Sequence, residues 1–474
     1  MTEHSNSAEA RDLAYHLHSF THLDSLAKDG PLVLESGDGI YVTDNHGKRY
    51  IEGISGLWNI VVGFNENRIA EAAFEQMKKL PAYHTFFGRT ASPVIDLAER
   101  LIELAPVAMK RVYFVNSGSE ANDTAIKMLW MLNKGAGKPE KRKIISRKSA
   151  YHGTTVASCS LNGKPYINCF GLPLPEVLYT DCPHFWRDGK PGESEEDYAQ
   201  RLADSLEALI QEEGAETIAG FIAEPVMGAG GALVPPQGYF EKIEAILRRH
   251  DIAFIADEVV CGFGRTGSMW GSQTYNFRPD IICTSKCLTA GYFPMGAVLM
   301  SPEIDAKLMH AAEALGEFPH GFTTAGHPVG AAIALKVLEL ISEPGGMFDN
   351  LCQVAPHFQA GLQKFADHPL VGEARGVGLI GALEIVADKA NKTPFAEEHL
   401  IGEQVVRAAQ KNGLILRPIG ESVIFAPPFI ISEAEIDDMF ERTGRVLDEI
   451  EQIVQKDNLR AAALTAAAAA AAAE

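Results

Sequence analysis

Lys286 is the side chain in this sequence that is best placed to act as a nucleophile. It follows the apolar run DIICTS, which predicts a buried strand, so the amine stands at a strand end. Burying a lysine is costly unless the amine is paired or neutral. Its pKa is therefore expected to fall, which suits the amine to form a Schiff base with an aldehyde. The alternative is a lysine that extends its amine from the strand end into solvent.

Asp257 ends a second apolar run, IAFIAD. Ligands of open α/β sheets bind beyond the carboxyl ends of the strands, so this carboxylate is expected in a ligand crevice. It could cap a loop or pair with Arg265. It could also hold a pyridine nitrogen protonated, which turns the ring into an electron sink for a substrate carbanion. The GFGRTG that follows lacks the spacing G-x-G-x-x-G, which weakens an interpretation as a dinucleotide site.

The segment NSGSEAND, residues 116–123, joins a third apolar run to a helical pattern. Ser117 and Glu120 have the S-x-x-E spacing of a capping box, and a well-capped helix alone would explain both residues. The Ser-Gly-Ser turn also lets a ligand approach the backbone closely, and the N–H groups at a helix N-terminus attract phosphate. Spacing alone leaves helix capping and phosphate binding open.

Alternating strands and helices must position these residues, which predicts an α/β fold with a mostly parallel central sheet. Residues 41–51 predict a hairpin with its turn at 44–47. Short apolar runs predict six further strands, at residues 112–115, 143–146, 218–224, 252–257, 281–285 and 296–300.

The chain of 474 residues exceeds what one hydrophobic core usually supports, so more than one domain is expected. We predict a large domain at residues 81–331. Both chain ends, residues 1–80 and 332–457, would form a smaller α/β domain. The alanine-rich end, residues 458–474, has no apolar stripe for docking and is set aside as a tail.

Charge and cysteine content argue against several classes of function. With 42 Lys and Arg against 62 Asp and Glu, the net charge of −20 repels nucleic acid and anionic membranes, so neither is an expected partner. The first residues do not read as a secretory signal and the seven scattered cysteines suit reduced thiols, which predicts a cytoplasmic protein. Cys283 and Cys287 have no His or Cys partner at zinc spacing, so no metal site is expected.

Together these segments resemble a class III (fold type I) aminotransferase, over about residues 14–454. SGLWN (55–59), YHTFFGR (83–89) and LRPIG (416–420) make the chain most similar to the amine:pyruvate, or ω-amino acid:pyruvate, transaminases. The class-wide motifs are NSGSEAND (116–123), YHG (151–153), EPVMGAGG (224–231), DEVVCGFGRTG (257–267), TSKCLTAG (284–291) and GFTTAGHP (321–328).

The resemblance implies pyridoxal 5'-phosphate (PLP) as the cofactor, with pyridoxamine phosphate (PMP) as the form that carries the amino group between two half-reactions. Lys286 would form the Schiff base and move the proton between substrate and cofactor, and Asp257 would pair with the pyridinium. A homodimer with shared active sites, or a tetramer, is also implied. The other cofactor contacts implied are Gly118 and Ser119 at the phosphate, Tyr151 and Val259 on the ring faces, Glu224 beside the ring, and Phe322 and Thr323 from a second subunit.

For the substrate, the resemblance points to an aromatic pocket of Phe20, Trp58 and Phe86, with Arg417 as the carboxylate partner. A keto acid needs a bidentate guanidinium, whereas an amine without a carboxylate needs apolar walls. The function implied is transfer of an amino group from an amine or ω-amino acid to pyruvate or a similar keto acid. Core packing of the aromatic side chains and a surface ion pair of Arg417 are the alternatives.

Other PLP chemistry on the same scaffold, decarboxylation or aminomutation, is the alternative within this class of enzyme. A non-enzymatic binding protein with a degenerate site is the alternative outside it. His152 and His320 lie inside the motifs, but no histidine base is expected because Lys286 already supplies one. Thr154 and Ala229 are expected near the pocket, where their size would help to select the amine.

Overall fold

The computed structural model describes residues 6–461 and 463–465. Its centre is a seven-stranded sheet with the strand order β4-β10-β9-β8-β7-β5-β6. β10 runs antiparallel to both of its neighbours and the remaining neighbours are parallel, so the predicted mostly parallel sheet is confirmed. The strands are β4 (Arg111–Val115), β5 (Lys143–Arg147), β6 (Val177–Thr180), β7 (Ile218–Ala223), β8 (Ala253–Asp257), β9 (Ile281–Thr284) and β10 (Gly296–Met300).

The six predicted strands are present, each within one residue of its expected ends. The sequence does not predict β6. This strand lies at the edge of the sheet, and three of its four residues are only half-buried. Its residues 177–179 are apolar, but the run is short and belongs to a half-buried edge strand.

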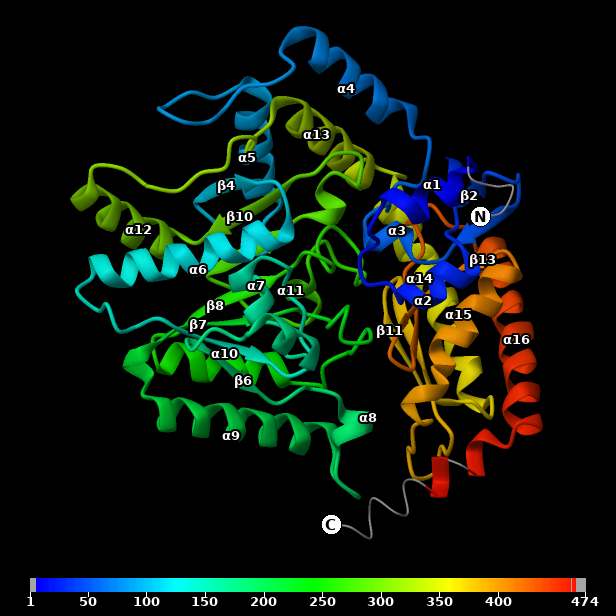
Figure 1. Ribbon diagram of the computed structural model, residues 1–474. Coiled ribbons are helices and arrows are strands. Elements are labelled where there is room, and N and C mark those ends of the chain that lie inside the picture. The colour runs from blue at the N-terminus through cyan, green and yellow to red at the C-terminus, as the bar shows by residue number, and fades with distance from the viewer. Residues whose placement is uncertain (1–5, 462, 466–474) are drawn as a thin grey trace.

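Helices cover both faces of this sheet (Figure 1). Along β8, Phe254 and Ala256 pack in the core shared with α9 and α10, whereas Ile255 packs in a second core with α6 and α12. The two-residue period of a strand requires this alternation, and it explains why the strands are apolar throughout. The helices around the sheet are α4 (Asn67–Lys79), α5 (Ser92–Leu104), α6 (Gly118–Gly135), α7 (Val156–Ser160), α8 (Phe185–Asp188), α9 (Glu195–Glu213), α10 (Tyr239–Arg249), α11 (Gly271–Thr274), α12 (Pro302–Leu315) and α13 (Pro328–Ser342).

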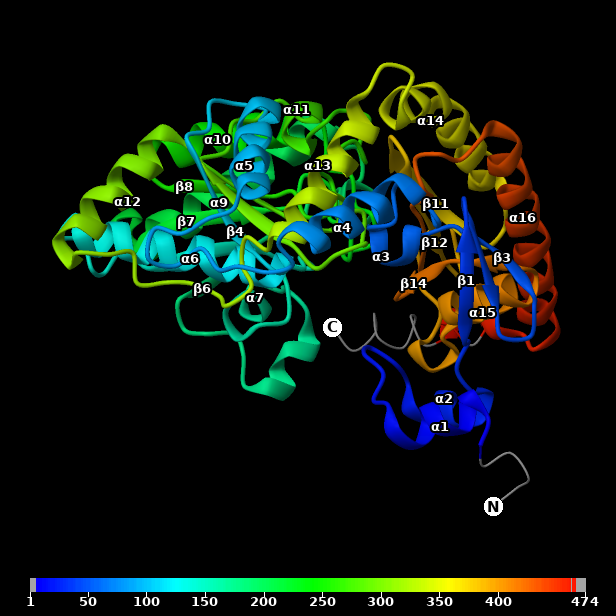
Figure 2. The ribbon, with the colours of Figure 1, turned by 90° about the horizontal axis from the view of Figure 1, so that it is seen from above.

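Two smaller sheets lie beside the large one, backed by α14 and α16 (Figure 2). One has the order β1-β2-β3-β13 and joins the two chain ends, because β13 pairs in parallel with β3. Tyr41 in β2 pairs with Ile51 in β3, which is the predicted hairpin. The other sheet has the order β11-β12-β15-β14. The division into domains after residues 80 and 331 stays a prediction.

The elements of this second part come from both ends of the chain. Its strands are β1 (Leu34–Asp38), β2 (Tyr41–Asp44), β3 (Arg49–Glu52), β11 (Val371–Val377), β12 (Ile380–Ile385), β13 (Leu414–Ile415), β14 (Arg417–Ile419) and β15 (Ser422–Phe425). Its helices are α3 (Ser55–Trp58), α14 (Met347–Gln363), α15 (Ile401–Lys411) and α16 (Glu433–Lys456).

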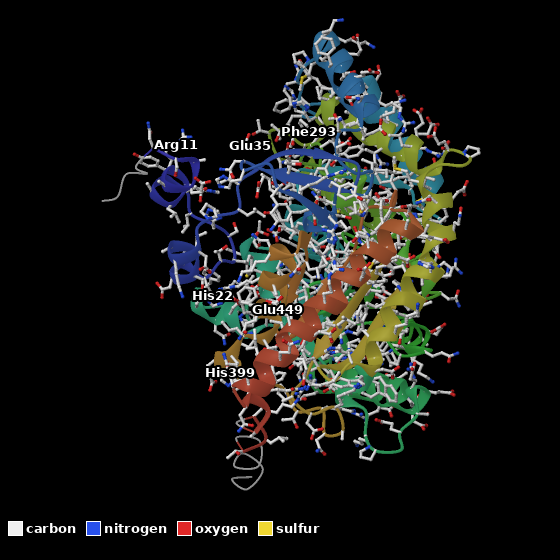
Figure 3. All side chains as sticks on the ribbon, turned by 90° about the vertical axis from the view of Figure 1, so that its right-hand side faces the viewer. Arg11, His22, Glu35, Phe293, His399 and Glu449 are labelled. Atoms are coloured by element: carbon white, nitrogen blue, oxygen red, sulfur yellow. The ribbon has the colours of Figure 1, made fainter. Side chains whose placement is uncertain are left out.

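Two N-terminal helices, α1 (Ala8–Tyr15) and α2 (Leu23–Asp29), project from the body of the molecule (Figure 2 and Figure 3). Neither helix buries a residue. Polar contacts attach them instead. Glu9 accepts a hydrogen bond from the Asn45 amide at 2.5 Å, and Asp29 pairs with Arg407 of α15 at 3.1 Å.

The predicted tail, residues 458–474, contacts the folded body at its start. Arg460 donates to the two carboxylate oxygens of Glu451 at 2.7 and 2.6 Å, and to the Ala387 carbonyl at 3.1 Å. The sequence does not predict this contact. Residues 462 and 466–474 lie outside the described part of the chain. Within the described part, every helix is too short or too polar to cross a bilayer.

Candidate active site

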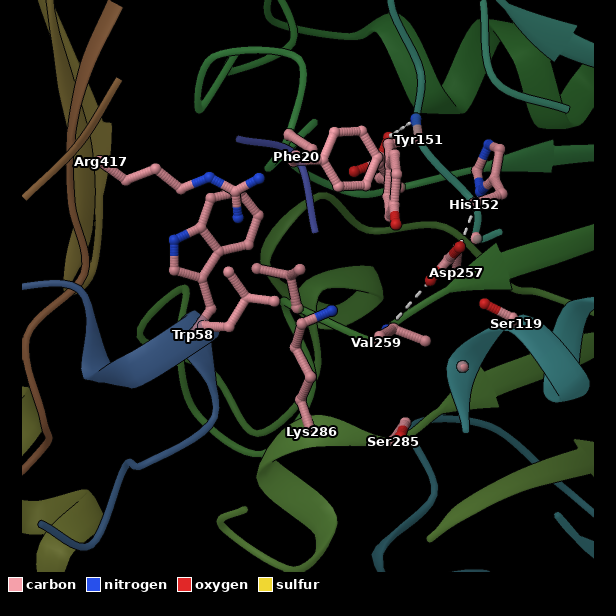
Figure 4. A pocket seen from close by; sticks show the side chains of 16 residues that line it. Phe20, Trp58, Ser119, Tyr151, His152, Asp257, Val259, Ser285, Lys286 and Arg417 are labelled. Atoms are coloured by element: carbon pink, nitrogen blue, oxygen red, sulfur yellow. Dashed lines mark hydrogen bonds and ion pairs between the residues drawn. The ribbon is translucent and has the colours of Figure 1, made fainter. Parts of the chain in front are cut away.

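A pocket opens where β8 and β9 end, beside the N-terminus of α6 (Figure 4). Lys286 and Asp257 both face it, as the predicted chemistry requires. Trp58 of α3 and Arg417 of β14 supply a wall from the second part of the fold. Ten of the predicted site residues line this pocket: Phe20, Trp58, Gly118, Ser119, Tyr151, Glu224, Asp257, Val259, Lys286 and Arg417.

Three hydrogen bonds hold the carboxylate of Asp257. Its Oδ2 accepts from the Asn122 amide at 2.8 Å and lies 2.7 Å from Nδ1 of His152, while Oδ1 accepts from the Val259 N–H at 3.1 Å. The residue is only 3% exposed. These partners compensate for the water that the carboxylate loses on burial, and they fix the direction in which it faces.

Arg265 is not a partner of Asp257, so that alternative is wrong. Its guanidinium is buried elsewhere and donates to the carbonyls of Leu379 at 3.0 Å and Pro427 at 2.7 Å. Burial lowers the pKa of Arg265 to about 10. Asp257 therefore has Asn122, His152 and Val259 as its partners, and it faces the pocket.

Lys286 begins a single 3-10 turn directly after β9, and its φ of 31° is unusual for a residue with a side chain. Such backbone strain persists where surrounding structure enforces it, often at functional sites. Burial lowers the pKa of the Lys286 amine, and the charge of Asp257 opposes that shift. A lowered pKa raises the fraction of neutral amine, which is the nucleophilic form. Because β8 and β9 are neighbouring parallel strands, their end residues share one crevice.

The start of α6 forms the end of the pocket nearest Asp257. The Ser117 hydroxyl caps the helix by accepting from the Glu120 N–H at 3.2 Å. The Glu120 carboxylate accepts from the N–H of Asn116 at 2.6 Å, one residue earlier than a capping box requires. The Ser119 hydroxyl accepts from the Thr154 N–H at 3.0 Å, which leaves its own proton for a ligand. The helix is therefore capped by Ser117, and its N-terminus together with the Ser119 hydroxyl could also hold an anion.

Gly153 keeps the wall opposite Ser119 thin. Its φ of 141° is a conformation that side chains rarely adopt, and a methyl group there would come within 2.5 Å of the Ser119 hydroxyl. A residue with a side chain would therefore push Ser119 away from the start of α6. The glycine of the YHG motif is explained by this close approach.

Glu224 holds two segments of the pocket wall together through hydrogen bonds to backbone N–H groups. Its Oε1 accepts from the Tyr151 N–H at 3.1 Å and its Oε2 accepts from the Gly228 N–H at 2.9 Å. Burial raises the pKa of this carboxyl group. The side chain thereby joins the segment that carries Tyr151 to the loop that packs under Trp58.

Arg417 lies over the indole of Trp58, with its guanidinium carbon 5.4 Å from the ring centre. Burial lowers the pKa of Arg417, yet an arginine keeps its charge in proteins. Trp58 itself is 2% exposed and has a positive φ of 64°. The surface ion pair proposed as the alternative for Arg417 is absent among the described residues, and the guanidinium is held by the aromatic face.

Gly228 lies directly against the six-membered ring of Trp58. We expect Gly228→Ala to push the indole into the pocket, because the added methyl group has no space beside it. Overpacking of this kind costs about 1–3 kcal/mol of stability. Thermal unfolding and kcat/KM for an aromatic amine would both fall. The matched control is Gly444→Ala in α16, where the methyl meets only a ring carbon of Phe365 at 3.8 Å. A Gly228→Ala enzyme that matches the wild type in both measurements contradicts this packing.

Phe86, Phe322 and Thr323 do not line the pocket within one chain. Phe86 is 36% exposed and its ring packs beside Gly321. Thr323 is exposed and Phe322 is half-buried. The resemblance assigns Phe322 and Thr323 to a neighbouring subunit, and their exposure is compatible with that expectation.

His152, which lines the pocket, and the buried Asn122 behind it are the partners of Asp257 that sequence reasoning did not identify. Asn122 lies in the NSGSEAND motif, and its amide also donates to the His152 carbonyl at 2.7 Å. Their place inside motifs is the signal that could have identified them. His320 lies elsewhere, 2.9 Å from the Thr124 hydroxyl, and burial lowers its pKa to about 4.

Residues 25–447 match the model of the class-III aminotransferase family. The chain belongs to this family. Gamma aminobutyrate transaminase 3, chloroplastic, of Solanum lycopersicum is 46% identical over 428 residues, which are 90% of this chain and 82% of the relative. An aminotransferase from Vibrio fluvialis in its PMP-bound form superposes with a TM-score of 0.93 at 50% identity, covering 94% of this chain and 98% of the other. An ω-aminotransferase from Paracoccus denitrificans has the same TM-score and identity, covering 94% and 100%.

The protein is therefore a PLP-dependent aminotransferase of fold type I, which transfers amino groups between small-molecule amines and keto acids. This excludes the interpretation as a non-enzymatic binding protein. The pocket fits the cofactor. A buried carboxylate suits the pyridine nitrogen, the Lys286 amine suits the aldehyde, and the start of α6 suits the phosphate. A methyl group at Gly118 would come within 3.0 Å of the Val259 side chain, so this glycine keeps the space between them open.

Proposed function

We propose that the enzyme moves an amino group from an amine or ω-amino acid to pyruvate or a similar small keto acid, in two half-reactions that alternate between PLP and PMP. The observation that carries this proposal is the position of Arg417 over Trp58 at the pocket wall. A guanidinium among aromatic rings offers a bidentate site to a keto acid carboxylate. When the Arg417 guanidinium moves aside, the pocket presents apolar walls to an amine that has no carboxylate.

The names of relatives support the same substrate class. The relative from Solanum lycopersicum is named for gamma aminobutyrate, whose amine is distant from its carboxylate, and the Paracoccus denitrificans structure is titled an ω-aminotransferase. Both names describe donors whose reacting amine is not next to a carboxylate. We extend that donor class to this chain, with the pocket of Phe20, Trp58 and Tyr151 as its walls.

In this reaction each residue of the pocket would have a separate role. PLP, when bound, supplies an electron sink that stabilises a substrate carbanion. Lys286 would accept a proton at its Nζ atom from the substrate carbon and pass it to the cofactor, and would carry it the opposite way in the second half-reaction. This is general acid–base catalysis suited to a lowered amine pKa. Asp257 keeps the pyridine nitrogen protonated by accepting its hydrogen bond. Gly118 and Ser119 bind the phosphate, and Tyr151 and Val259 exclude water from the two ring faces.

A homodimer is part of this proposal. Phe322 and Thr323 would reach the phosphate of the neighbouring subunit, and Phe86 would complete the substrate pocket. The exposed apolar side chains of Phe74 and Phe87, 60% and 85% exposed in one chain, support a buried contact between two copies. Sedimentation at micromolar concentration tests the homodimer, and a monomer with full activity contradicts it.

We also propose that the protein is cytoplasmic.

Arg417→Leu should separate the two substrates. Losing a charge-assisted bidentate contact costs about 1.5–3 kcal/mol, so KM for pyruvate should rise roughly 10-fold to 100-fold. The half-reaction with an amine that lacks a carboxylate should change little. Arg445→Leu is the matched control, because Arg445 lies on α16 and pairs with the exposed Glu441. Equal losses for both substrates would show that Arg417 supports the fold instead.

A donor panel tests the proposed function as a whole. The purified enzyme is incubated with pyruvate and, in turn, a polyamine, a β-amino acid, gamma aminobutyrate and an aryl-alkyl amine, and the alanine formed is measured. We expect alanine from ω-amine donors with no release of carbon dioxide. Carbon dioxide in step with donor consumption would favour a decarboxylase, and an isomeric amine without alanine would favour an aminomutase.

A further inference from the structure

Asp12, His16 and His18 bring three metal-binding side chains together outside the active site. One carboxylate oxygen and one ring nitrogen of each histidine all lie within 4.8 Å of one another. Asp12 Oδ1 is 2.9 Å from Nδ1 of His16, and Oδ2 is 2.5 Å from Nε2 of His18. We propose that these residues bind one divalent transition-metal ion, and that Zn²⁺ is the ion they suit best.

Local structure brings the three side chains to one place. Asp12 and His16 are four residues apart on α1 and its C-cap, so they share a face of the helix. The chain leaves the helix at His16 with an extended φ of −118° and ψ of 126°, which places His18 on the same side. The two histidine rings lie 4.5 Å apart between centroids. The spacing D-x-x-x-H-x-H is the sequence signal for this cluster, whereas the expectation of no metal considered only cysteines.

The ligand chemistry selects the class of cation. Imidazole nitrogen with one carboxylate suits Zn²⁺, Cu²⁺ or Ni²⁺, whereas Mg²⁺ and Ca²⁺ prefer oxygen ligands. Zn²⁺ holds its ligands at about 2.0–2.2 Å, which in a tetrahedral site separates them by about 3.4 Å. Binding would require the carboxylate oxygens to move away from the ring nitrogens, which lie 2.9 and 2.5 Å from them in the absence of an ion. The side chains of His16, His18 and Asp12 are 64%, 24% and 21% exposed, so water can supply the remaining ligand.

The site lies next to a residue of the active-site pocket. Phe20 lines the pocket and follows His18 by two residues. Because α1 and α2 bury no residue, this segment is held by polar contacts and by the edge-to-face packing of Phe20 on Tyr166, whose ring centroids lie 5.6 Å apart. An ion that joins α1 to His18 would restrict the segment that carries Phe20. Figure 3 shows Arg11 and His22 projecting from the body of the molecule, so this part of the chain is accessible to solvent.

Zinc titration of the full-length, tag-free enzyme loaded with PLP tests the proposal. Chelator-treated protein competes with a chromophoric zinc chelator, so that stoichiometry and affinity are both measured. We expect one Zn²⁺ per chain, no displacement by excess Mg²⁺, and slower tryptic cleavage after Arg11. In His18→Ala and Asp12→Asn the zinc affinity should fall by at least roughly 10-fold to 100-fold. That range is the cost of losing a residue that only hydrogen-bonds to a metal ligand, and a direct ligand contributes at least as much.

His22→Ala is the matched control, because His22 lies in the same segment and pairs with Glu403 at 3.2 Å. It should bind zinc like the wild type. The visible absorption of the bound cofactor reports folding for every variant. If His18→Ala loses that absorption, His16→Ala replaces it, since His16 is the most exposed ligand. Zinc affinity that is equal in all variants, or absent from the wild type, overturns the site, and neither result depends on the proposed substrates.

Discussion

Lys286→Ala is expected to abolish turnover and to remove the visible absorption of the Schiff base with the cofactor. The substitution deletes both the nucleophile and the proton-transfer group. General acid–base catalysis alone contributes about 10²-fold to 10⁴-fold, so the combined loss should exceed that range. Steady-state alanine formation and an absorption spectrum of the purified variant measure the two effects.

The matched control for that experiment is Lys164→Ala. Burial also lowers the pKa of Lys164, but its amine donates to the Ala229 carbonyl and does not line the pocket. This variant should keep the visible band. An unchanged spectrum in Lys286→Ala would refute the assignment of the Schiff base to position 286.

Asp257→Asn should slow the transfer of the amino group while the cofactor stays bound. The amide keeps the shape of the carboxylate but removes its charge, so the pyridine nitrogen loses its ionic partner. Removing one partner of a buried ion pair costs about 3–5 kcal/mol. If the lower end of this range is lost from the stabilisation of the transition state, the rate falls roughly a hundredfold. Stopped-flow absorption of the amine half-reaction measures the rate directly.

Asp96→Asn, at an exposed position on α5, is the control for charge removal and should behave like the wild type. The same spectrum reports cofactor content, which separates lost binding from lost catalysis. An Asp257→Asn enzyme within a few-fold of the wild-type rate would mean that this carboxylate serves the fold alone.

The ends of the central strands could be predicted from the sequence because burial on both faces leaves an uninterrupted apolar run. Lys286 and Asp257 were identifiable for the same reason, since each follows such a run and the two strands are neighbours. β6 has only the short apolar run of residues 177–179, is half-buried at the sheet edge, and was not predicted. Apolar pattern therefore locates buried strands and the polar residues that follow them.

The rest of the pocket could not be worked out from periodicity. Arg417 reaches the site because β14 pairs with β15, and Trp58 reaches it through a turn with positive φ. Both depend on long-range packing, so only the family resemblance pointed to them. The contact between His152 and Asp257 joins residues 105 positions apart in a non-periodic loop. Phe322 and Thr323 lie outside the pocket of a single chain, and the role that the resemblance implies for them would require a second copy.

The central claim is that the amine of Lys286 holds the cofactor opposite Asp257. The most direct test is reduction of the PLP-loaded enzyme with borohydride, followed by peptide mapping of the pyridoxyl group by mass spectrometry. The pyridoxyl label is expected on the peptide that contains Lys286. A label on Lys164 or any other lysine, at full occupancy and with Lys286 unmodified, would contradict it.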